Sequence, residues 1–540
     1  MTHFFIFNNA SRAANYGVGT YIRQLSEGLS ICPDTAVTFI DMYANVKEFA
    51  VTTDEQGYRH YQIPAAPTGR ESDTYCRCQF YLLARHIHAD APDRLVFQFN
   101  YFHHFSLAAL LKAHFPDCRI ILTVHYLNWC FELNGNLSRL RKLISEGYEP
   151  SDDTEQRIIA AFTDEQRFLH FSDEVFVLSR NTRSILTEDY RVNPDKLHLI
   201  YNGAGDCLYV RKEENPTHRN ILFMGRLDEI KGLKYLISAF EKIAPKYLDT
   251  RLVIAGDGDF QPYLSQSRSM QERISFLGRV QGDEVEQVYR SAYIGVMPSF
   301  HEQCSYTAIE MMRHGIPLIG TDSTGLAEML DATPQLRIHI DEENFEEESF
   351  VSQIADRLEL LLSDQSAYHK FSQAVCRLFE ERYRTSSMTQ SIQDALHKSF
   401  DRPSYILSTD YLPHIDERMK RLVEQRPDID TDFFGLSGIA VYLWWRFCSL
   451  QEQAGKEEQT ATLRTVLEQC MEWMLQAVEG TQLSSEMTAT LLNMQEKSFC
   501  PAITKSLSAT CDSTQQSATV EIPAEYRIIH NALNIYNCKI

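Results

Sequence analysis

Short apolar runs alternate with amphipathic segments along most of the chain, and this alternation restricts the fold more than any other feature. Runs such as RIILTV at 119–124 and RLVIA at 251–255 are typical of buried strands, and the segments between the runs have helical periodicity. Tight hairpin signals are missing, so we expect neighbouring strands to be parallel and joined by helices. The sequence therefore predicts an α/β fold with doubly wound parallel sheets, whose ligands bind at the carboxyl ends of the strands.

The expected elements fall into two series, separated by a polar linker at 212–219. Strands are expected at 3–7, 36–41, 95–99, 119–124, 174–178 and 197–201, and then at 220–224, 251–255, 274–277, 293–297 and 317–320. Helices are expected at 20–29, 75–89, 106–114, 155–171, 181–189, 233–243, 284–291, 305–313, 343–362, 367–382 and 385–400. Because the second series begins again with a strand, two α/β domains are predicted.

Composition limits the classes of function. The chain has 540 residues, which is too long for one hydrophobic core, and 44% of them are apolar, as in ordinary globular proteins. A formal net charge of −21 disfavours non-specific binding to nucleic acid or anionic lipid. Thirteen scattered cysteines and no secretory leader lead us to expect reduced thiols in a cytoplasmic protein. No apolar run is long enough to span a bilayer. The sequence does not decide whether the protein makes peripheral contact with a membrane.

The stretch 298–325 gathers acidic, amide and hydroxyl side chains at the start of the helix expected at 305–313. Ser305 or Thr307 is expected to cap this helix. A helix N-terminus has unpaired backbone N–H groups and a partial positive charge, and both suit a phosphate. Ser305, Tyr306 and Thr307 are therefore candidate phosphate-binding residues.

Two carboxylates, Glu302 and Glu310, flank this helix start with seven residues between them. They resemble the E-x7-E element of retaining glycosyltransferases with the GT-B fold, in particular glycosyltransferase family 4. The resemblance implies two Rossmann-like domains that face a cleft and a site for a nucleotide-diphospho-sugar. It also implies that Glu310 lies near the ribose hydroxyls and that Glu302 lies near the sugar.

Two cations follow the first strand of the second series, in the string GRLDEIKG. Arg226 offers a planar fork of donors and Lys231 a compact charge, so the pair suits a diphosphate. The string resembles the donor-phosphate grip of the same family. Gly17 and Gly19 lie between the first strand and the first helix, where backbone N–H groups can approach an anion closely. The resemblance implies that these two glycines face the donor phosphates across the cleft.

His125 directly follows the strand at 119–124, in a T-V-H string that resembles the family's, and the resemblance places it beside the sugar. Two departures from the family stand nearby. Tyr126 occupies a position that is often Asp in the family. Because of this departure, the resemblance does not decide what lines the acceptor side of the pocket. The residues 303–305 are Gln-Cys-Ser, where the family usually has glycines, so we expect a narrower pocket and an unusual donor preference.

The resemblance also implies a division into domains. Residues 1–205 form an N-terminal, acceptor-side domain, which ends after Asn202-Gly203, and residues 206–384 form the donor domain. The helix 385–400 is expected to cross back to the first domain. Residues 401–540 are expected to form a helical extension with a partly mobile tail. Its apolar segment 432–445 must pack against other residues.

The predicted activity is transfer of a sugar from a nucleotide-diphospho-sugar to an acceptor hydroxyl, with retention of configuration. Arg226, Lys231, the helix start at 305–307 and the backbone at 17–19 would stabilise the leaving diphosphate, so neither a metal nor a cofactor is expected. His125 and Glu302 would hold the sugar. The acceptor stays open between a glycan, a lipid-linked sugar, a small molecule and a peptide. Two alternatives remain, a non-catalytic nucleotide-sugar-binding scaffold and a sugar-nucleotide epimerase on the same fold.

Overall fold

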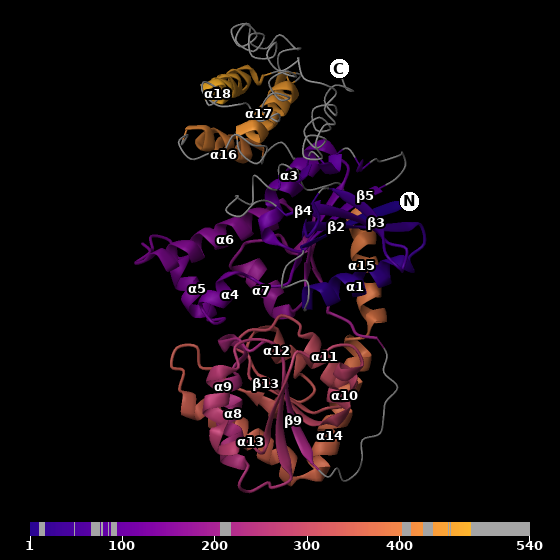
Figure 1. The fold of residues 1–540 in the computed structure, drawn as a ribbon, viewed down its shortest axis with the longest axis vertical. Coiled ribbons are helices and arrows are strands. Elements are labelled where there is room, and N and C mark those ends of the chain that lie inside the picture. The colour runs from indigo at the N-terminus through magenta and orange to yellow at the C-terminus, as the bar shows by residue number, and fades with distance from the viewer. Residues whose placement is uncertain are drawn as a thin grey trace, which may run out of the picture. The chain divides into compact units, whose positions relative to one another are not determined.

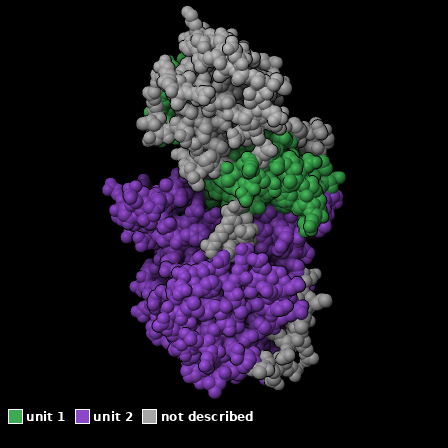
Figure 2. Space-filling model, in the orientation of Figure 1, with its two compact units in different colours: residues 1–11, 34–120, 404–540 green, residues 12–33, 121–403 purple. Residues whose placement is uncertain are grey.

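The computed structural model describes residues 1–9, 17–47, 49–65, 76, 79–80, 82–84, 86–87, 94–205, 218–401, 412–424, 436–451, 453 and 455–476. The chain divides into two compact units, which Figure 2 shows in different colours. Unit 1 comprises residues 1–11, 34–120 and 404–540, and unit 2 comprises residues 12–33 and 121–403. The expected boundary between domains at 205 and 206 stays a prediction.

Unit 1 carries a largely parallel sheet in the order β3-β4-β2-β1-β5. Its strands are β1 (Thr2–Asn9), β2 (Thr35–Ala44), β3 (Ala50–Thr53), β4 (Arg59–Pro64) and β5 (Arg94–Phe99). β1 pairs in parallel with β2 and β5, and β2 pairs in parallel with β4. The apolar run Phe4–Phe7 is buried along its whole length, as expected for a central strand covered on both faces.

The strands β3 and β4 pair antiparallel, so the expectation that no hairpin occurs is wrong here. The turn between them is built by Asp54, whose carboxylate accepts hydrogen bonds from the backbone N–H of Gln56 at 3.0 Å and of Tyr58 at 2.9 Å. Gly57 adds a positive φ of 89°. Asp and Gly are typical turn residues, so the sequence does contain turn residues here. The loop is longer than the two-residue loop of a tight hairpin, and the hairpin was therefore not recognised.

Helices α3 (Phe105–His114), α16 (Leu412–Glu424), α17 (Leu436–Gln451) and α18 (Glu457–Gln476) also belong to unit 1. The expectation of a helical C-terminal region is confirmed for the described part of it. An ion pair of 2.9 Å between Arg446 and Asp416 joins α17 to α16. The ring of Trp445 packs on that of Phe80 with centroids 5.5 Å apart, so this end of the expected apolar segment, within its described part 436–445, packs on other residues. The predicted mobile tail and the predicted helix at 75–89 fall wholly or largely outside the described residues.

Unit 2 contains a parallel run β6-β7-β8 and a fully parallel sheet in the order β11-β10-β9-β12-β13-β14. The strands are β6 (Arg119–Val124), which begins at the edge of unit 1, β7 (Glu174–Val177), β8 (Leu197–Leu199), β9 (Arg219–Met224), β10 (Thr250–Ala255), β11 (Ile274–Gly278), β12 (Ala292–Met297), β13 (Leu318–Thr321) and β14 (Arg337–Ile338). Every strand expected in this part of the chain is present, within a few residues of its expected ends.

The helices of unit 2 lie between these strands, as doubly wound sheets require. They are α1 (Gly17–Ser30), α4 (Trp129–Glu132), α5 (Leu137–Leu143), α6 (Asp153–Phe171), α7 (Arg180–Glu188), α8 (Leu233–Ile243), α9 (Gln261–Gln266), α10 (Asp283–Ser291), α11 (Tyr306–Arg313), α12 (Thr324–Met329), α13 (Glu347–Ser363), α14 (Gln365–Arg382) and α15 (Thr385–Phe400). Figure 1 shows α8, α9 and α13 on one side of the strands β9 and β13, and α10 and α14 on the other. The expectation of parallel-sheet α/β domains is therefore confirmed.

Helix α15 returns along helix α1 inside unit 2. The hydroxyl of Thr385 donates to the amide oxygen of Gln24 at 2.6 Å. Backbone hydrogen bonds also join the start of α15 to Ala204, because the N–H of Thr385 donates to the carbonyl of Ala204 at 3.0 Å. Gly203 permits this approach, since a side chain there would lie 2.7 Å from the Cα of Thr385. These contacts hold α15 against α1 within unit 2, and the expected crossing of 385–400 to a first domain stays a prediction.

Three general observations concern only the part of the chain that the structure describes. No helix there is long and apolar enough to cross a membrane. The described cysteines are free thiols. No group of three or more His, Cys, Asp or Glu side chains among the described residues is arranged to hold a metal ion.

We predict that Gly232→Ala destabilises the fold more than Gly278→Ala does. Both glycines have left-handed φ, 68° and 69°, which costs an L-residue about 1–2 kcal/mol. Only at Gly232 would the new Cβ also meet a backbone atom, the carbonyl oxygen of Pro298 at 2.1 Å, whereas Gly278 faces open space. Denaturant unfolding should therefore show about twice the loss for Gly232→Ala. Equal losses would contradict this packing.

Candidate functional site

A pocket of about 770 Å³ lies inside unit 2, where the carboxyl ends of β6, β9 and β12 meet the start of α11. This volume suits a small-molecule ligand. Of the ten residues predicted for the site, eight line the pocket: Gly17, His125, Arg226, Lys231, Glu302, Ser305, Tyr306 and Thr307. Gly19 and Glu310 are not among the lining residues.

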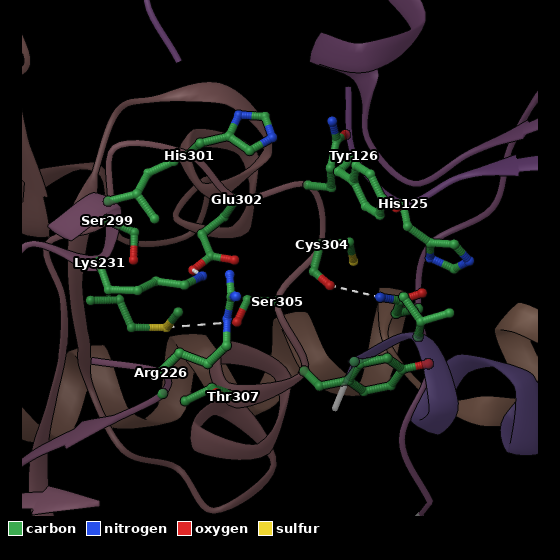
Figure 3. Close-up of a pocket in the computed structure, with 18 of the residues that line it drawn as sticks. His125, Tyr126, Arg226, Lys231, Ser299, His301, Glu302, Cys304, Ser305 and Thr307 are labelled. Atoms are coloured by element: carbon green, nitrogen blue, oxygen red, sulfur yellow. Dashed lines mark hydrogen bonds and ion pairs between the residues drawn. The ribbon is translucent and has the colours of Figure 1, made fainter. Parts of the chain in front are cut away.

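The cationic end of the pocket is formed by Arg226 and Lys231, which follow β9, and by the first turn of α11 (Figure 3). Each cation is paired with a carboxylate. Arg226 lies 2.9 Å from Asp228, and the ammonium of Lys231 lies 2.5 Å from the Oε1 atom of Glu302. Ser305 caps α11, as expected, and its hydroxyl faces the backbone N–H of Ala308 at 3.5 Å. Two cations and a helix N-terminus therefore converge on one end of the pocket.

The backbone of Glu302 is held by the segment that follows β13. Its N–H donates to the hydroxyl of Thr324 at 2.9 Å, and its carbonyl accepts from the N–H of Gly325 at 2.8 Å. Gly325 allows this contact, because a side chain at 325 would lie 1.7 Å from the carbonyl oxygen of Gln303. These contacts fix the backbone of Glu302, and the ion pair with Lys231 holds its carboxylate.

Gln303 and Cys304 lie in the loop that departs from the glycine-containing loop of the family, and both are buried. The amide oxygen of Gln303 accepts hydrogen bonds from Ser179, at 3.3 Å, and from Thr182, both at the start of α7. The carbonyl of Cys304 accepts from the side-chain amide of Asn202 at 2.7 Å. In the sequence, Asn202 marks only the expected end of the first domain. The structure shows that it anchors the loop before α11.

His125 lies at the end of β6 and faces the pocket from the side opposite Arg226 and Lys231 (Figure 3). Its ring packs edge-on against that of Tyr21 on α1, with centroids 4.6 Å apart. The hydroxyl of Tyr21 lies 2.9 Å from that of Thr123 on β6. Burial lowers the pKa of His125 to about 3, so its imidazole is neutral at physiological pH. It can exchange hydrogen bonds with a sugar hydroxyl, but it does not add a charge.

Glu310 lies on α11 and pairs with Arg313, whose Nε atom is 2.9 Å from its Oε2 atom. Burial raises the pKa of this carboxyl, and the nearby Arg313 opposes the rise. Arg313 also contacts Glu286 on α10 at 2.8 Å. Glu310 is thus engaged in a network beside the pocket. Its predicted contact with the ribose stays a prediction.

The segment 126–131, which follows His125, contributes pocket residues that sequence analysis did not identify, namely Asn128 and Phe131. It is held by Glu165 on α6, which is fully buried and accepts a hydrogen bond from the backbone N–H of Asn128 at 2.6 Å. The hydroxyl of Tyr190 donates to the same carboxylate at 2.5 Å. Burial raises the pKa of Glu165 to about 7. An acidic residue on a helix gave no sequence signal, because its role depends on a loop 37 residues away.

Family models match both α/β parts of the chain. The model described as Glycosyltransferase Family 4 matches residues 16–204, and the model described as Glycosyl transferases group 1 matches residues 218–364. The chain belongs to this family of glycosyltransferases. Both the E-x7-E pair and the cationic string fall inside the second match.

Curated relatives and solved structures agree with the family. An uncharacterized glycosyltransferase of Methanocaldococcus jannaschii is 32% identical over 175 residues, which are 29% of this chain and 45% of that protein. A D-inositol 3-phosphate glycosyltransferase of Corynebacterium glutamicum is 27% identical over 183 residues, which are 30% of this chain and 44% of that protein. The chain therefore spans about half the length of these curated relatives.

Among solved structures, sucrose-phosphate synthase from Thermosynechococcus elongatus superposes with a TM-score of 0.58 at 17% identity, over 74% of this chain and all of that one. HepE of Anabaena, solved with UDP and glucose, superposes with a TM-score of 0.50 at 15% identity, over 73% of this chain and 99% of that one. At this level of identity the likeness concerns the fold. It is the GT-B fold of glycosyltransferases, with two parallel-sheet α/β domains.

We predict that Glu165→Gln changes how stability depends on pH. The native pKa of about 7 lies above the ordinary value of about 4.3, so the folded protein binds more protons than the unfolded chain between these values. The free energy of unfolding of the wild type should therefore fall as the pH rises from 5 to 8, by about 1–3 kcal/mol relative to the variant. Denaturant unfolding at several pH values measures the difference. Parallel pH profiles would contradict it.

Proposed function

We propose that this chain is a retaining glycosyltransferase that uses a nucleotide-diphospho-sugar. The observation that carries the proposal is the meeting of Arg226, Lys231 and the start of α11 at one end of a pocket that also holds Glu302 and His125. Family membership supports transfer of a sugar. The UDP and glucose bound to HepE, a protein of the same fold, support a nucleotide-sugar donor.

The cationic end of the pocket suits the diphosphate of the donor. Arg226 can engage phosphate oxygens with two parallel N–H groups, and Lys231 adds a second charge. Each of these cations is paired with a carboxylate, so neither charge stands unpaired inside the pocket wall. Diphosphate binding would draw Lys231 toward the phosphates and leave Glu302 to contact the sugar.

During transfer, the bond from the anomeric carbon of the sugar to the phosphate oxygen breaks, and its electron pair stays on the diphosphate. Arg226, Lys231 and the backbone N–H groups at the start of α11 would stabilise this growing negative charge. The acceptor oxygen bonds to the anomeric carbon, and its proton would pass to an oxygen of the leaving diphosphate. Neutral His125 and Glu302 would orient the sugar through hydrogen bonds to its hydroxyls.

This arrangement supplies positive charge without a metal ion, so we propose a metal-independent reaction. Retention of the anomeric configuration rests on the family alone. A cytoplasmic location, a cofactor-free reaction and possible peripheral contact with a membrane stay predictions from the sequence.

We expect Arg226→Ala and Lys231→Ala each to lower kcat by about 10²–10³, because each removes charge that faces the leaving diphosphate. Arg251→Ala is the matched control, since Arg251 is an exposed arginine on β10 outside the pocket lining. Steady-state kinetics with the preferred donor measure the effect, and circular dichroism checks that the variants fold. Unchanged kcat in both pocket variants would remove the proposed role of this end of the pocket.

We also expect one class of nucleotide sugar to raise the melting temperature in a screen of UDP-, GDP-, ADP- and TDP-sugars. A donor present at 100 times its dissociation constant should stabilise the folded state by about 2.7 kcal/mol. The product of the reaction should retain the anomeric configuration of the donor when it is followed by NMR. If none of these donors shifts the melting temperature or is consumed, the proposed function is wrong.

A further inference from the structure

Four side chains form a second surface in the pocket, which we call the acceptor wall: Tyr126, Asn128, Phe131 and His301. Figure 3 shows His301 and Tyr126 at one end of the pocket and Arg226 and Thr307 at the other. These wall residues lie toward the other end of the pocket from Arg226 (Figure 3), and His301 is within electrostatic reach of Lys231. The proposed phosphate contacts do not use the acceptor wall.

The aromatic part of the wall consists of Phe131 and Tyr126. Phe131 is 46% exposed although it is a large apolar side chain, and its ring packs edge-on against Tyr126 with centroids 5.5 Å apart. Aromatic faces carry negative charge density and bind weakly positive C–H groups. The apolar face of a pyranose ring presents such groups. The exposed ring therefore fits the flat side of a sugar.

The polar part of the wall is His301, which is only 7% exposed. Neither nitrogen of its imidazole has a hydrogen-bond partner among the described residues, although both are buried. Leaving such groups unpaired is costly, so a buried polar group at a pocket wall indicates a ligand that completes its hydrogen bonds. Burial lowers the pKa of His301 to about 4, so the ring is neutral and offers one donor and one acceptor. A hydroxyl group, which both donates and accepts, matches this pair.

The wall is held in place before any ligand binds. Glu165 fixes the backbone of Asn128, and the neighbouring Trp129 and Cys130 are buried. Gly135 lies against the loop that carries His301, because a side chain at 135 would come within 2.7 Å of the carbonyl oxygen of Phe300. The chain that continues from the 126–131 segment is thus packed against the loop that carries His301. Such preorganisation reduces the entropy lost on binding.

The charges of the side chains that line the pocket indicate whether the wall would bind a neutral or a phosphorylated sugar. Among the described residues that line the pocket, the lysine and arginine side chains are Lys231 and Arg226, and both belong to the cationic end. Tyr126, Asn128, Phe131 and His301 supply an aromatic surface, an amide and a neutral imidazole. The wall itself offers a phosphate group no charged donor, and Lys231, which acts electrostatically on His301, is paired with Glu302.

We propose that the acceptor wall is the acceptor subsite and that it takes an uncharged sugar ring, stacked on Phe131 and hydrogen-bonded to His301. This inference rests on the proposed function, because it names the acceptor of the same reaction. It assigns the specificity for the acceptor to the wall and the recognition of the donor to the cationic end.

The test measures acceptor kinetics at saturating donor, with methyl pyranosides of glucose, galactose, mannose and N-acetylglucosamine and with the 6-phosphates of the same sugars. We expect at least one neutral pyranoside to be glycosylated, and its 6-phosphate to be used at least about tenfold less efficiently, since no cation of the wall compensates the charge. If only the phosphorylated sugars are used, or if donor is bound but no neutral pyranoside is glycosylated, the proposal is wrong.

Variants connect this specificity to the wall. Phe131→Ala and His301→Ala should each raise KM for the neutral sugar by about tenfold or more, because stacking or a hydrogen bond is lost. Phe131→Tyr keeps the ring, and His301→Gln keeps a donor and an acceptor. Both variants should therefore have a KM for the neutral sugar close to that of the wild type. Leu248→Ala is the control, since Leu248 is 81% exposed and outside the pocket lining. Unchanged KM in both alanine variants would overturn the proposal.

The donor screen separates the two hypotheses. Thermal shifts with the nucleotide sugar report the donor site without an acceptor. If the wild type shows a donor shift and the acceptor predictions fail, the acceptor subsite is wrong and the proposed function stands. If the wild type shows no donor shift and no transfer, the proposed function itself fails.

Discussion

The site depends on the close approach of two backbone segments, the loop 300–305 before α11 and the turn after β13. The N–H of Gly325 donates to the carbonyl of Glu302, and any side chain at position 325 would overlap the backbone of Gln303. Gly232 allows a second close approach, to the carbonyl of Pro298, which lies two residues before the loop 300–305. Because these contacts are between backbone atoms, they fix the positions of Glu302 and of the α11 N-terminus to within small limits. The side chains of the pocket depend on that fixed frame.

The chain has a formal net charge of −21, but the charged side chains at the cationic end of the pocket form ion pairs. The two cations at the phosphate end are each paired with a carboxylate. The histidines of the pocket, half-buried His125 and buried His301, are neutral because desolvation lowers the pKa of each. The pocket thus contains one end suited to an anion and one suited to hydroxyl groups. This separation agrees with a reaction in which a charged donor meets an uncharged acceptor, as proposed.

Much of the fold could be predicted from the sequence, because the relevant signals are local. Strand β6 and helix α8 begin and end at the expected residues, since apolar runs and 3.6-residue periodicity are properties of consecutive positions. The hairpin of β3 and β4 was missed because its turn is longer than a tight hairpin loop. The short helices α4 and α5 were also missed, since one or two turns carry too few positions to show a period.

The candidate site divides in the same way. The sequence by itself determined that Arg226, Lys231 and His125 follow strand ends, and these residues line one pocket because parallel strands bring their carboxyl ends together. Their roles were assigned through the family resemblance and stay predictions. Only the tertiary structure decided that Gln303 turns to α7, which is more than a hundred residues away in the chain. It alone decided that His301 is buried without a partner. The physical reason is that burial and hydrogen-bond satisfaction depend on neighbours in space, whereas periodicity and spacing depend on neighbours along the chain.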